Sequence, residues 1–255
     1  MRIATWNVNS LAARMPRVID WLSMAKPDVL CLQETKLVDA AFPRDALAEL
    51  GYDAATYGIS QWNGVAILSR VGLDDVRRGF DQEPGFPAAE ARSVAATCDG
   101  TRIWSIYVPN GRTVGSDAFA YKLAWLEAIR APLASDAAAA PLAVLGDFNI
   151  APTDADVWDP AAFIGSTHVT PDERSAVQTL LGLGLVDVQP RAFKGLPFTY
   201  WDYRAGNFHK GMGMRIDLVL LSTSLAARVH DAYIDRDTRK GKLPSDHAAV
   251  VVDLD

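Results

Sequence analysis

Residues 142–151 read Leu-Ala-Val-Leu-Gly-Asp-Phe-Asn-Ile-Ala, an apolar run that stops at Gly146 and leads into Asp147 and Asn149. A short, fully apolar run is typical of a buried β-strand, and the glycine indicates where it breaks. Two interpretations of the polar pair stay open on this stretch alone. Asp147 and Asn149 could close an Asx turn, or they could project into a cleft where an acid takes a proton and an amide holds an oxygen. The ends of the other strands decide between them.

The composition is that of an ordinary globular protein. The chain has 255 residues, of which 49% are hydrophobic and 22% charged, and no change of composition divides it, so one domain over 1–255 is the simplest assignment. It contains no apolar run of membrane-spanning length and no signal-like start, so we expect a cytoplasmic protein without a membrane partner. Cys31 and Cys98 lie in apolar runs without metal or redox spacing, which predicts reduced packing residues.

The net charge of −6 argues against a protein that simply coats nucleic acid. It leaves room for a local basic face, because a metal site built from carboxylates would itself contribute several of the negative charges. The balance of charge therefore excludes neither class of partner.

Apolar patterns along the chain predict many short strands and few helices. Alternating or continuous apolar runs predict strands at 2–6, 29–32, 93–98, 102–108, 142–145, 215–221 and 248–252, and a hairpin over 51–69. Helical periodicity predicts helices near 11–22, 117–129 and 171–181, whereas 151–170 is expected to be an irregular surface connection. The lack of regular strand–helix alternation favours an α/β protein of two packed sheets flanked by helices.

Polar residues stand at the tips of six of these apolar strands. They are Asn7, Glu34, Tyr107, Asp147 with Asn149, Asp217, and Asp246 with His247. Each alone has an ordinary structural explanation, such as a turn amide or a solvated acid. Their recurrence at strand ends instead favours a shared site.

The residue types of this set indicate metal-assisted chemistry. Carboxylates, amides and one imidazole, without a thiolate, suit a hard cation such as Mg²⁺ or Mn²⁺ rather than zinc. Such a cation withdraws charge from a phosphate oxygen and stabilises the leaving oxyanion. An Asp free of the metal can take a proton from water, and an Asp bonded to a His can support the charged imidazole. The set therefore predicts phosphodiester hydrolysis.

Six ordered motifs resemble those of the exonuclease III family of abasic-site endonucleases, within the endonuclease/exonuclease/phosphatase group of DNase I-like fold. They are Trp6-Asn-Val-Asn9, Leu32-Gln-Glu-Thr-Lys36, Tyr107-Val-Pro-Asn110, Gly146-Asp-Phe-Asn149, Arg215-Ile-Asp217 and Ser245-Asp-His247. Each motif is modest, but their order and spacing cover the whole chain. The resemblance implies a four-layered αββα sandwich of two packed mixed sheets, with the site at one edge of both.

The resemblance also implies a metal site, with Glu34 as the main carboxylate and Mg²⁺ as the cofactor, for which Mn²⁺ could substitute. The ligands that it implies at or near the metal are Asn7, Glu34, Asp147, Asn149, Asp246 and His247. Whether one or two metals act, and whether Asp147 is a base or a ligand, stays open.

Catalytic roles follow from the same resemblance. Asp147 would activate or deliver the attacking water, and Asn149 would orient it and stabilise the pentacovalent state. His247, paired with Asp217, would bind the scissile phosphate. Two further residues would contact that phosphate, Tyr107 and Asn110.

The resemblance also implies a pocket for a base-free sugar where Tyr200 and Trp201 approach Met214 and Ile216, although core packing explains Trp201 equally well. Such a pocket would admit a flipped abasic deoxyribose and exclude a normal base. Residues that could face DNA phosphates, or simply be solvated, are Lys36, Arg112, Lys122, Lys194, Arg204, Lys210, Arg239, Lys240 and Lys242.

The resemblance therefore implies a monomeric, Mg²⁺-dependent DNA repair enzyme. It would act on double-stranded DNA, cleaving the backbone 5′ to abasic sites and removing 3′ nucleotides or 3′ blocking groups. A general DNase without abasic preference is the nearest alternative, and a lipid or inositol-phosphate phosphodiesterase would need a different loop at 198–216. A non-catalytic binding module is disfavoured, because it would be expected to have lost Glu34, Asp147 or His247.

Overall fold

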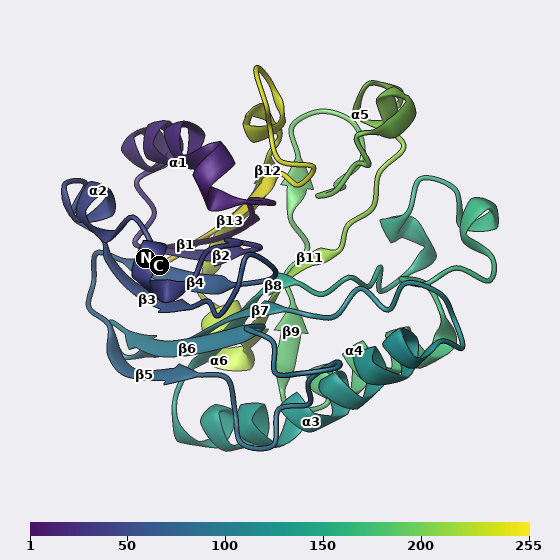
Figure 1. Cartoon of the computed structure of the whole chain (residues 1–255), viewed down its shortest axis with the longest axis horizontal. Coiled ribbons are helices and arrows are strands. Elements are labelled where there is room, and N and C mark those ends of the chain that lie inside the picture. Colours follow the sequence, from purple (N-terminus) through teal and green to yellow (C-terminus); the bar gives the residue numbers. More distant parts are fainter.

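Two mixed β-sheets lie face to face in the computed structural model, which describes all 255 residues (Figure 1). The first sheet contains, in spatial order, β10 (Arg191–Ala192), β12 (Val229–Asp235), β13 (Ala249–Leu254), β1 (Arg2–Asn7), β2 (Val29–Gln33), β4 (Val65–Ser69) and β3 (Asp53–Tyr57). The second contains β5 (Asp74–Arg78), β6 (Ser93–Cys98), β7 (Thr101–Tyr107), β8 (Leu142–Asp147), β11 (Asp217–Ser222) and β9 (Leu185–Asp187).

Helices cover the outer face of each sheet, as Figure 1 shows. Helices α1 (Leu11–Ala25) and α2 (Arg44–Ala48) pack on the first sheet, and α3 (Asp117–Ala139) and α4 (Pro171–Leu181) pack on the second. The short helices α5 (Asn207–Lys210) and α6 (Thr223–Ala226) lie in connections. The four-layered αββα sandwich expected from the sequence is confirmed.

Three apolar cores hold the layers together. The central core of 24 buried residues lies between the sheets and includes Ile3, Cys31 and Leu145. Two outer cores, of 19 and 16 buried residues, join each sheet to its helices. A central strand is thus covered on both faces, which explains why its sequence is continuously apolar rather than alternating. Cys31 and Cys98 are free and buried, as predicted.

Four strands escaped the sequence analysis, namely β5, β9, β10 and β12. The five residues of β5 are all exposed, and β9 and β10 have three and two residues, so their sequences carry no apolar signal. In β12 only Ala232 and Ile234 are buried, and the residues around them are half-buried or exposed, so the apolar signal is weak. The predicted hairpin is confirmed as β3 and β4. The 151–170 segment is the irregular connection that was expected, with 3₁₀ turns at Asp154–Asp156 and Pro160–Phe163 and an isolated bridge from Val157 to Met214.

Strand register brings the polar strand tips to one edge. Strand β7 runs parallel to β8 with Tyr107 opposite Asp147, and β8 runs antiparallel to β11 with Asp147 opposite Asp217. In the other sheet β1 runs parallel to β2, so Asn7 lies opposite Gln33 and next to Glu34. The ends of four strands and the beginnings of two therefore meet at the same edge.

Buried hydrogen bonds join the sheets just below this edge. The Gln33 side chain accepts from Thr5 Oγ1 at 3.1 Å and donates to Ser105 Oγ on the facing sheet, also at 3.1 Å. Because neither partner can move without leaving a buried polar group unpaired, this chain of hydrogen bonds holds the two sheets in a defined register.

None of the helices is long and apolar enough to cross a membrane.

Candidate active site

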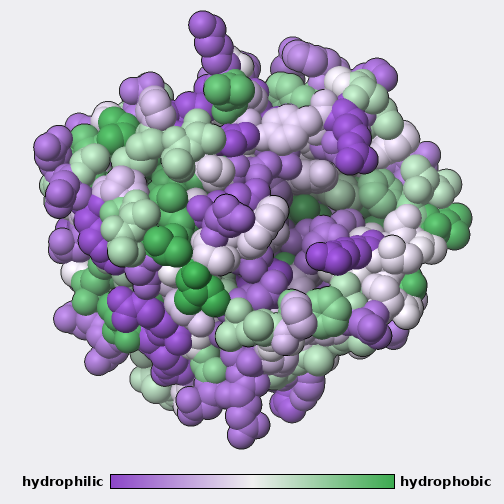
Figure 2. Space-filling view, in the orientation of Figure 1, coloured by the Kyte–Doolittle hydropathy of each residue, from purple (hydrophilic) through white to green (hydrophobic).

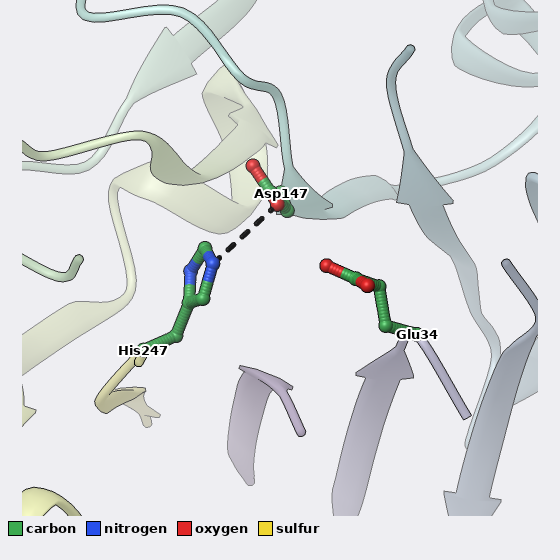
Figure 3. Close-up of side chains that lie close together, drawn as sticks. All are labelled: Glu34, Asp147 and His247. Atoms are coloured by element: carbon green, nitrogen blue, oxygen red, sulfur yellow. Dashed lines mark ion pairs between the residues drawn. The ribbon is translucent and has the colours of Figure 1, made fainter. Parts of the chain in front are cut away.

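Glu34, Asp147 and His247 converge at the shared sheet edge (Figure 3). Glu34 follows β2, Asp147 ends β8 and His247 precedes β13. One potential ligand atom from each of these residues lies within 4.8 Å of the others. The His247 Nε2 atom is 3.7 Å from Asp147 Oδ2. Two carboxylates and an imidazole at this separation form a set that fits a hard divalent cation.

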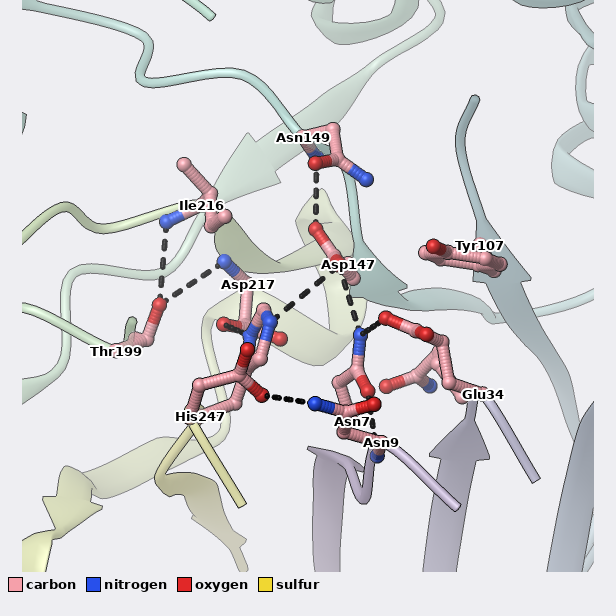
Figure 4. A network of polar contacts seen from close by, with 12 residues as sticks. Asn7, Asn9, Glu34, Tyr107, Asp147, Asn149, Thr199, Ile216, Asp217 and His247 are labelled. Atoms are coloured by element: carbon pink, nitrogen blue, oxygen red, sulfur yellow. Dashed lines mark hydrogen bonds and ion pairs between the residues drawn. The ribbon is translucent and has the colours of Figure 1, made fainter. Parts of the chain in front are cut away.

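Asn7 lies between the two carboxylates (Figure 4). Its Nδ2 donates to Glu34 Oε1 and to Asp147 Oδ2, each at 2.9 Å, while its Oδ1 accepts from the Asn9 backbone N–H at 3.0 Å. The amide nitrogen, not the oxygen, therefore faces the carboxylates. In this arrangement Asn7 holds Glu34 and Asp147 together and does not offer the oxygen expected of a metal ligand.

Asp217 supports the imidazole of His247. The distance from His247 Nδ1 to Asp217 Oδ2 is 2.8 Å, and both side chains are buried. Burial alone would lower the pKa of His247, but the carboxylates of Asp217 and Asp147 outweigh it and raise this pKa to about 10. His247 is therefore positively charged at neutral pH and points its other ring nitrogen at Asp147.

Asp147 is poised to titrate near neutrality. Burial raises the pKa of Asp147 to about 7, and the charges of Asp217 and Glu34 act in the same direction, against the attraction of His247. Its Oδ1 accepts a hydrogen bond from the Asn149 backbone N–H at 2.8 Å. A carboxylate with this pKa can exchange protons with water at physiological pH.

Glu34 and Tyr107 keep opposite protonation states. Burial favours neutral Glu34, but the ammonium of Lys36, at 3.0 Å, and the Asn7 hydrogen bond lower the pKa of Glu34 below its usual value. Burial, followed by the charge of Glu34, raises the pKa of Tyr107 well above its usual value. The site thus holds an ionised carboxylate beside a neutral phenol that can donate a hydrogen bond.

Asn149 and Asn110 bond to each other. Asn110 Nδ2 donates to Asn149 Oδ1 at 3.0 Å, and Asn149 Nδ2 donates to the Val108 carbonyl at 3.0 Å. Asn149 has a left-handed φ of 52°, which turns the chain sharply after β8. The Asn149 side chain therefore bonds to the neighbouring loop. Asp246 accepts a hydrogen bond from Asn9 Nδ2 at 3.1 Å and lines the cavity, but it lies outside the group formed by Glu34, Asp147 and His247.

A cavity of 380 Å³ opens over these residues, with an apolar wall beside the polar floor. Figure 2 shows the hollow near the centre of this face, with mostly hydrophilic surface around a small apolar patch. The lining of the cavity includes the predicted residues Tyr107, Asn110, Met214 and Ile216. Tyr200 also lines it, and the Tyr200 ring lies 4.9 Å from the His247 ring.

Trp201 is not part of this wall. It is fully buried, its ring lies 5.1 Å from that of Phe208, and the guanidinium of Arg236 lies 4.9 Å from it. The pocket role expected for Trp201 is thus corrected to core packing. Tyr200 faces the cavity instead, because adjacent residues of an extended segment point to opposite sides.

Trp158, Phe163 and His168, which were not predicted from the sequence, also line the cavity. They come from the irregular connection 151–170, where no periodicity marks them. The Trp158 backbone N–H bonds to the Gly213 carbonyl at 3.0 Å, which brings this connection over the cavity. Burial and the nearby Lys122 lower the pKa of His168 to about 4, so its imidazole is neutral.

Two of the basic residues considered for phosphate contact are buried. Lys122 has no exposed side-chain surface and pairs with Glu173, and Arg239 packs against Trp201 and Phe208. Neither faces DNA nor is solvated, which corrects that expectation. Lys36 is bound to Glu34, and the exposed members are Arg112, Lys194, Arg204, Lys210, Lys240 and Lys242.

Comparisons with known proteins agree with this geometry. A model of the Endonuclease/Exonuclease/phosphatase family matches residues 4–247. The chain is 31% identical to exodeoxyribonuclease III of Haemophilus influenzae, over 98% of both chains. Among solved structures it resembles the 3′ phosphatase NExo from Neisseria bound to a product DNA hairpin, with 39% identity, a TM-score of 0.95, and 100% and 99% of the two chains covered. It also resembles an AP endonuclease from Archaeoglobus fulgidus, with 37% identity, a TM-score of 0.93 and the same coverage. The order of the strand-end residues, the sandwich and these likenesses agree, and the chain belongs to the endonuclease/exonuclease/phosphatase family.

Proposed function

We propose that this protein is a metal-dependent DNA repair phosphodiesterase that cleaves the backbone 5′ to abasic sites and removes 3′ nucleotides or 3′ blocking groups. The observation that carries the proposal is the convergence of Glu34, Asp147 and His247 at the floor of one cavity. The likeness to an exodeoxyribonuclease III, an AP endonuclease and a DNA-bound 3′ phosphatase supports DNA as the substrate.

The metal that we propose is Mg²⁺, with Mn²⁺ as a substitute, held mainly by the ionised carboxylate of Glu34 with Asp147 beside it, while protonated His247 stays free of the metal. When bound, such a cation neutralises a non-bridging phosphate oxygen and stabilises the leaving oxyanion. The oxygen-dominated donor set, which lacks a thiolate, supports a hard cation over zinc.

The remaining steps are assigned to the chain's own groups. Asp147, with its pKa near 7, takes the proton of the attacking water, and the Asn149 backbone N–H holds its carboxylate in place. Protonated His247 and the neutral phenol of Tyr107 donate hydrogen bonds to phosphate oxygens as charge builds up in the transition state.

The shape of the site supports an abasic or end-trimmed substrate. A cavity of 380 Å³ with Trp158, Phe163, Met214 and Ile216 on its wall suits a bare deoxyribose that has left the duplex. A second groove of 510 Å³ shares Tyr107 and Asn110 with the cavity. The exposed residues Trp62 and Arg112 line this groove, which offers the DNA strand a path away from the cavity.

A single domain over 1–255, a monomeric state and a cytoplasmic location stay predictions from the sequence. The single-domain prediction is supported by the central core, because it draws residues from Ile3 to Leu254.

The test compares three duplexes with the same sequence: one with an internal abasic analogue, one with a 3′-phosphate and one intact. Each is incubated with Mg²⁺, with Mn²⁺ or with chelator. We expect metal-dependent nicking 5′ to the abasic analogue and release of the 3′-phosphate. Asp147→Asn abolishes both activities, whereas Asp53→Asn, at an exposed acid of β3, leaves them intact.

The outcomes separate the alternatives. Equal cutting of the abasic and intact duplexes would indicate a general DNase. Release of the 3′-phosphate without nicking would restrict the enzyme to 3′ ends. Failure on all three duplexes would refute the DNA proposal and favour lipid or inositol phosphates.

A further inference from the structure

A fully buried ion pair lies beneath the candidate active site, between α3 and α4. Lys122 Nζ is 2.5 Å from Glu173 Oε1, and neither side chain has any exposed surface. Lys122 Nζ also donates to the backbone carbonyl of Asn149 at 2.7 Å and, more weakly, to that of Asn110 at 3.3 Å. The ammonium therefore connects the two loops that follow β7 and β8.

Glu173 binds the segment that forms another wall of the cavity. It accepts hydrogen bonds from the Thr167 hydroxyl at 2.7 Å, from the His168 backbone N–H at 2.9 Å, and from the hydroxyl and backbone N–H of Thr170 at 2.7 and 3.0 Å. His168 Nδ1 in turn lies 2.5 Å from the Asn149 carbonyl. Three segments that are distant in sequence thus meet at one ion pair.

Stability alone is a weak explanation for this arrangement. Two charges lose their hydration when they are buried, and apolar residues of similar volume often replace such a pair without loss of stability. Lys122 and Oε1 of Glu173 instead contact the loops that carry Asn110, Asn149 and His168, whereas Oε2 of Glu173 closes the N-terminal capping box of α4 with Thr170. Lys122 binds the Asn149 backbone carbonyl, and the Asn149 backbone N–H donates to the Asp147 carboxylate at 2.8 Å. The orientation of Asn149 therefore affects the position of the Asp147 carboxylate directly.

We propose that Lys122 and Glu173 are positioning residues of the phosphodiesterase reaction, which hold Asn110 and Asn149 so that Asp147 and the phosphate-facing groups keep their productive geometry. Neither residue touches the substrate. The inference rests on the proposed function, because it assigns these two residues a part in the reaction of that same site.

The test replaces both charges at once, with Lys122→Met and Glu173→Leu in the same chain. No unpaired charge stays buried, but the Asn149 carbonyl and the His168 and Thr170 N–H groups lose their partners, so we expect a lower melting temperature in a chain that still folds. We expect kcat to fall about 10- to 100-fold, which is the range that a misplacement of about 1 Å can cause, with KM nearly unchanged. Arg102→Met with Asp136→Leu is the matched control, because this largely buried pair lies at the opposite end of β7 and should leave kcat unaltered.

Unchanged kcat in the folded double variant would overturn the proposal. Lys122 contacts the Asn149 backbone carbonyl directly, and the N–H of the same residue holds Asp147, so loss of the pair must be felt in the reaction.

Hydrogen exchange gives a readout that does not depend on the substrate. We expect faster amide exchange in 108–111 and 147–150 of the double variant, and unchanged exchange there would overturn the positioning role. Thr167→Val, which removes one hydroxyl from the network at nearly constant volume, should give the same pattern more weakly and serves if the double variant does not fold. Wild-type protein that is inactive on all three duplexes would refute the proposed function, while hydrogen exchange would still decide whether the pair holds the loops.

Discussion

At the scale of single residues, the site depends on charges that are buried together. Asp147, Asp217 and His247 are each at most 3% exposed, so their charges interact in a medium of low polarity where each one shifts the others. Two non-glycine residues of the site, Glu34 and Asn149, also have left-handed φ values of 52°. Such strain persists only where surrounding contacts hold it, which is typical of functional sites.

Asp217→Asn tests the charge support of His247. The amide keeps the shape of the carboxylate but cannot stabilise the imidazolium, so we expect the pKa of His247 to fall from about 10 by more than about one unit. We also expect kcat to fall about 10- to 100-fold, because the imidazolium loses the carboxylate that orients it and supports its charge as negative charge builds up on the phosphate. An NMR titration of the metal-free protein measures the pKa, and an unchanged value would refute this account.

Glu83 gives a prediction on pH and stability. It accepts hydrogen bonds from Trp125 Nε1 at 2.9 Å and from Ser93 Oγ at 3.3 Å, and burial raises the pKa of Glu83 to about 7. The folded state therefore prefers the protonated form. Stability should be greatest below the usual Glu pKa and should fall as pH rises toward 7, by about 2–3 kcal/mol.

The matched variant is Glu83→Gln, which keeps the acceptor and removes the titration. Urea unfolding at pH 5 and pH 8 measures the difference for both proteins. A wild type that loses no more stability than Glu83→Gln between these pH values would show that Glu83 does not ionise in this way.

At the scale of elements, the approach of β8 to β7 leaves no room for a side chain at Gly146. A Cβ atom there would lie 1.9 Å from the Ile106 carbonyl oxygen of β7. Gly146 also has a φ of 154°, which side-chain-bearing residues rarely adopt. The glycine that ends the apolar run therefore allows the two strand tips to stay paired where Tyr107 meets Asp147.

Gly146→Ala should consequently destabilise the protein by about 3 kcal/mol or more, since backbone must move to relieve the overlap. Gly100→Ala is the control, because Gly100 has a φ of 72° but no atom within 4 Å of a Cβ. Its cost should be about 1–2 kcal/mol from backbone strain alone. Chemical unfolding measures both, and equal losses would contradict the steric explanation.

At the scale of the whole molecule, the cavity exists because both sheets end at one edge and three connections close over it. The 151–170 connection, the 198–216 region and the loop before β13 come from distant parts of the chain. The adjoining groove extends this surface past Asn110 to Arg112 and Trp62. A strongly negative chain can thus present a DNA-binding face, since only the local charge meets the phosphates.

Arg112→Ala tests this path. If the exposed Arg112 side chain neutralises one phosphate, its removal should weaken DNA binding and reduce the slope of log affinity against log salt by about 1. Arg130→Ala, at an exposed site on α3, should change neither quantity. Fluorescence anisotropy at several salt concentrations measures both, and an unaltered slope for Arg112→Ala would exclude the contact.

Much of the fold and site could be predicted because its signals are local. Apolar runs identify buried strands such as β2 and β8, and a polar residue directly before or after such a run must stand at a sheet edge. The positions of Glu34, Asp147 and His247 follow from this pattern, and the order of the six motifs indicates the family. These features depend on neighbouring residues in the chain, which a sequence displays directly.

Only the tertiary structure decided which side chains face the cavity and which support it. Trp201 and Trp158 are both tryptophans near the site, but the first packs in the core and the second lines the cavity. In the sequence Lys122 resembles a solvated helical lysine, but in the structure it is buried against Glu173, 51 residues away. Asn7 turns its nitrogen to the carboxylates because Asn9 occupies its oxygen. Each of these outcomes depends on contacts between segments far apart in the chain, and local patterns carry no record of such contacts.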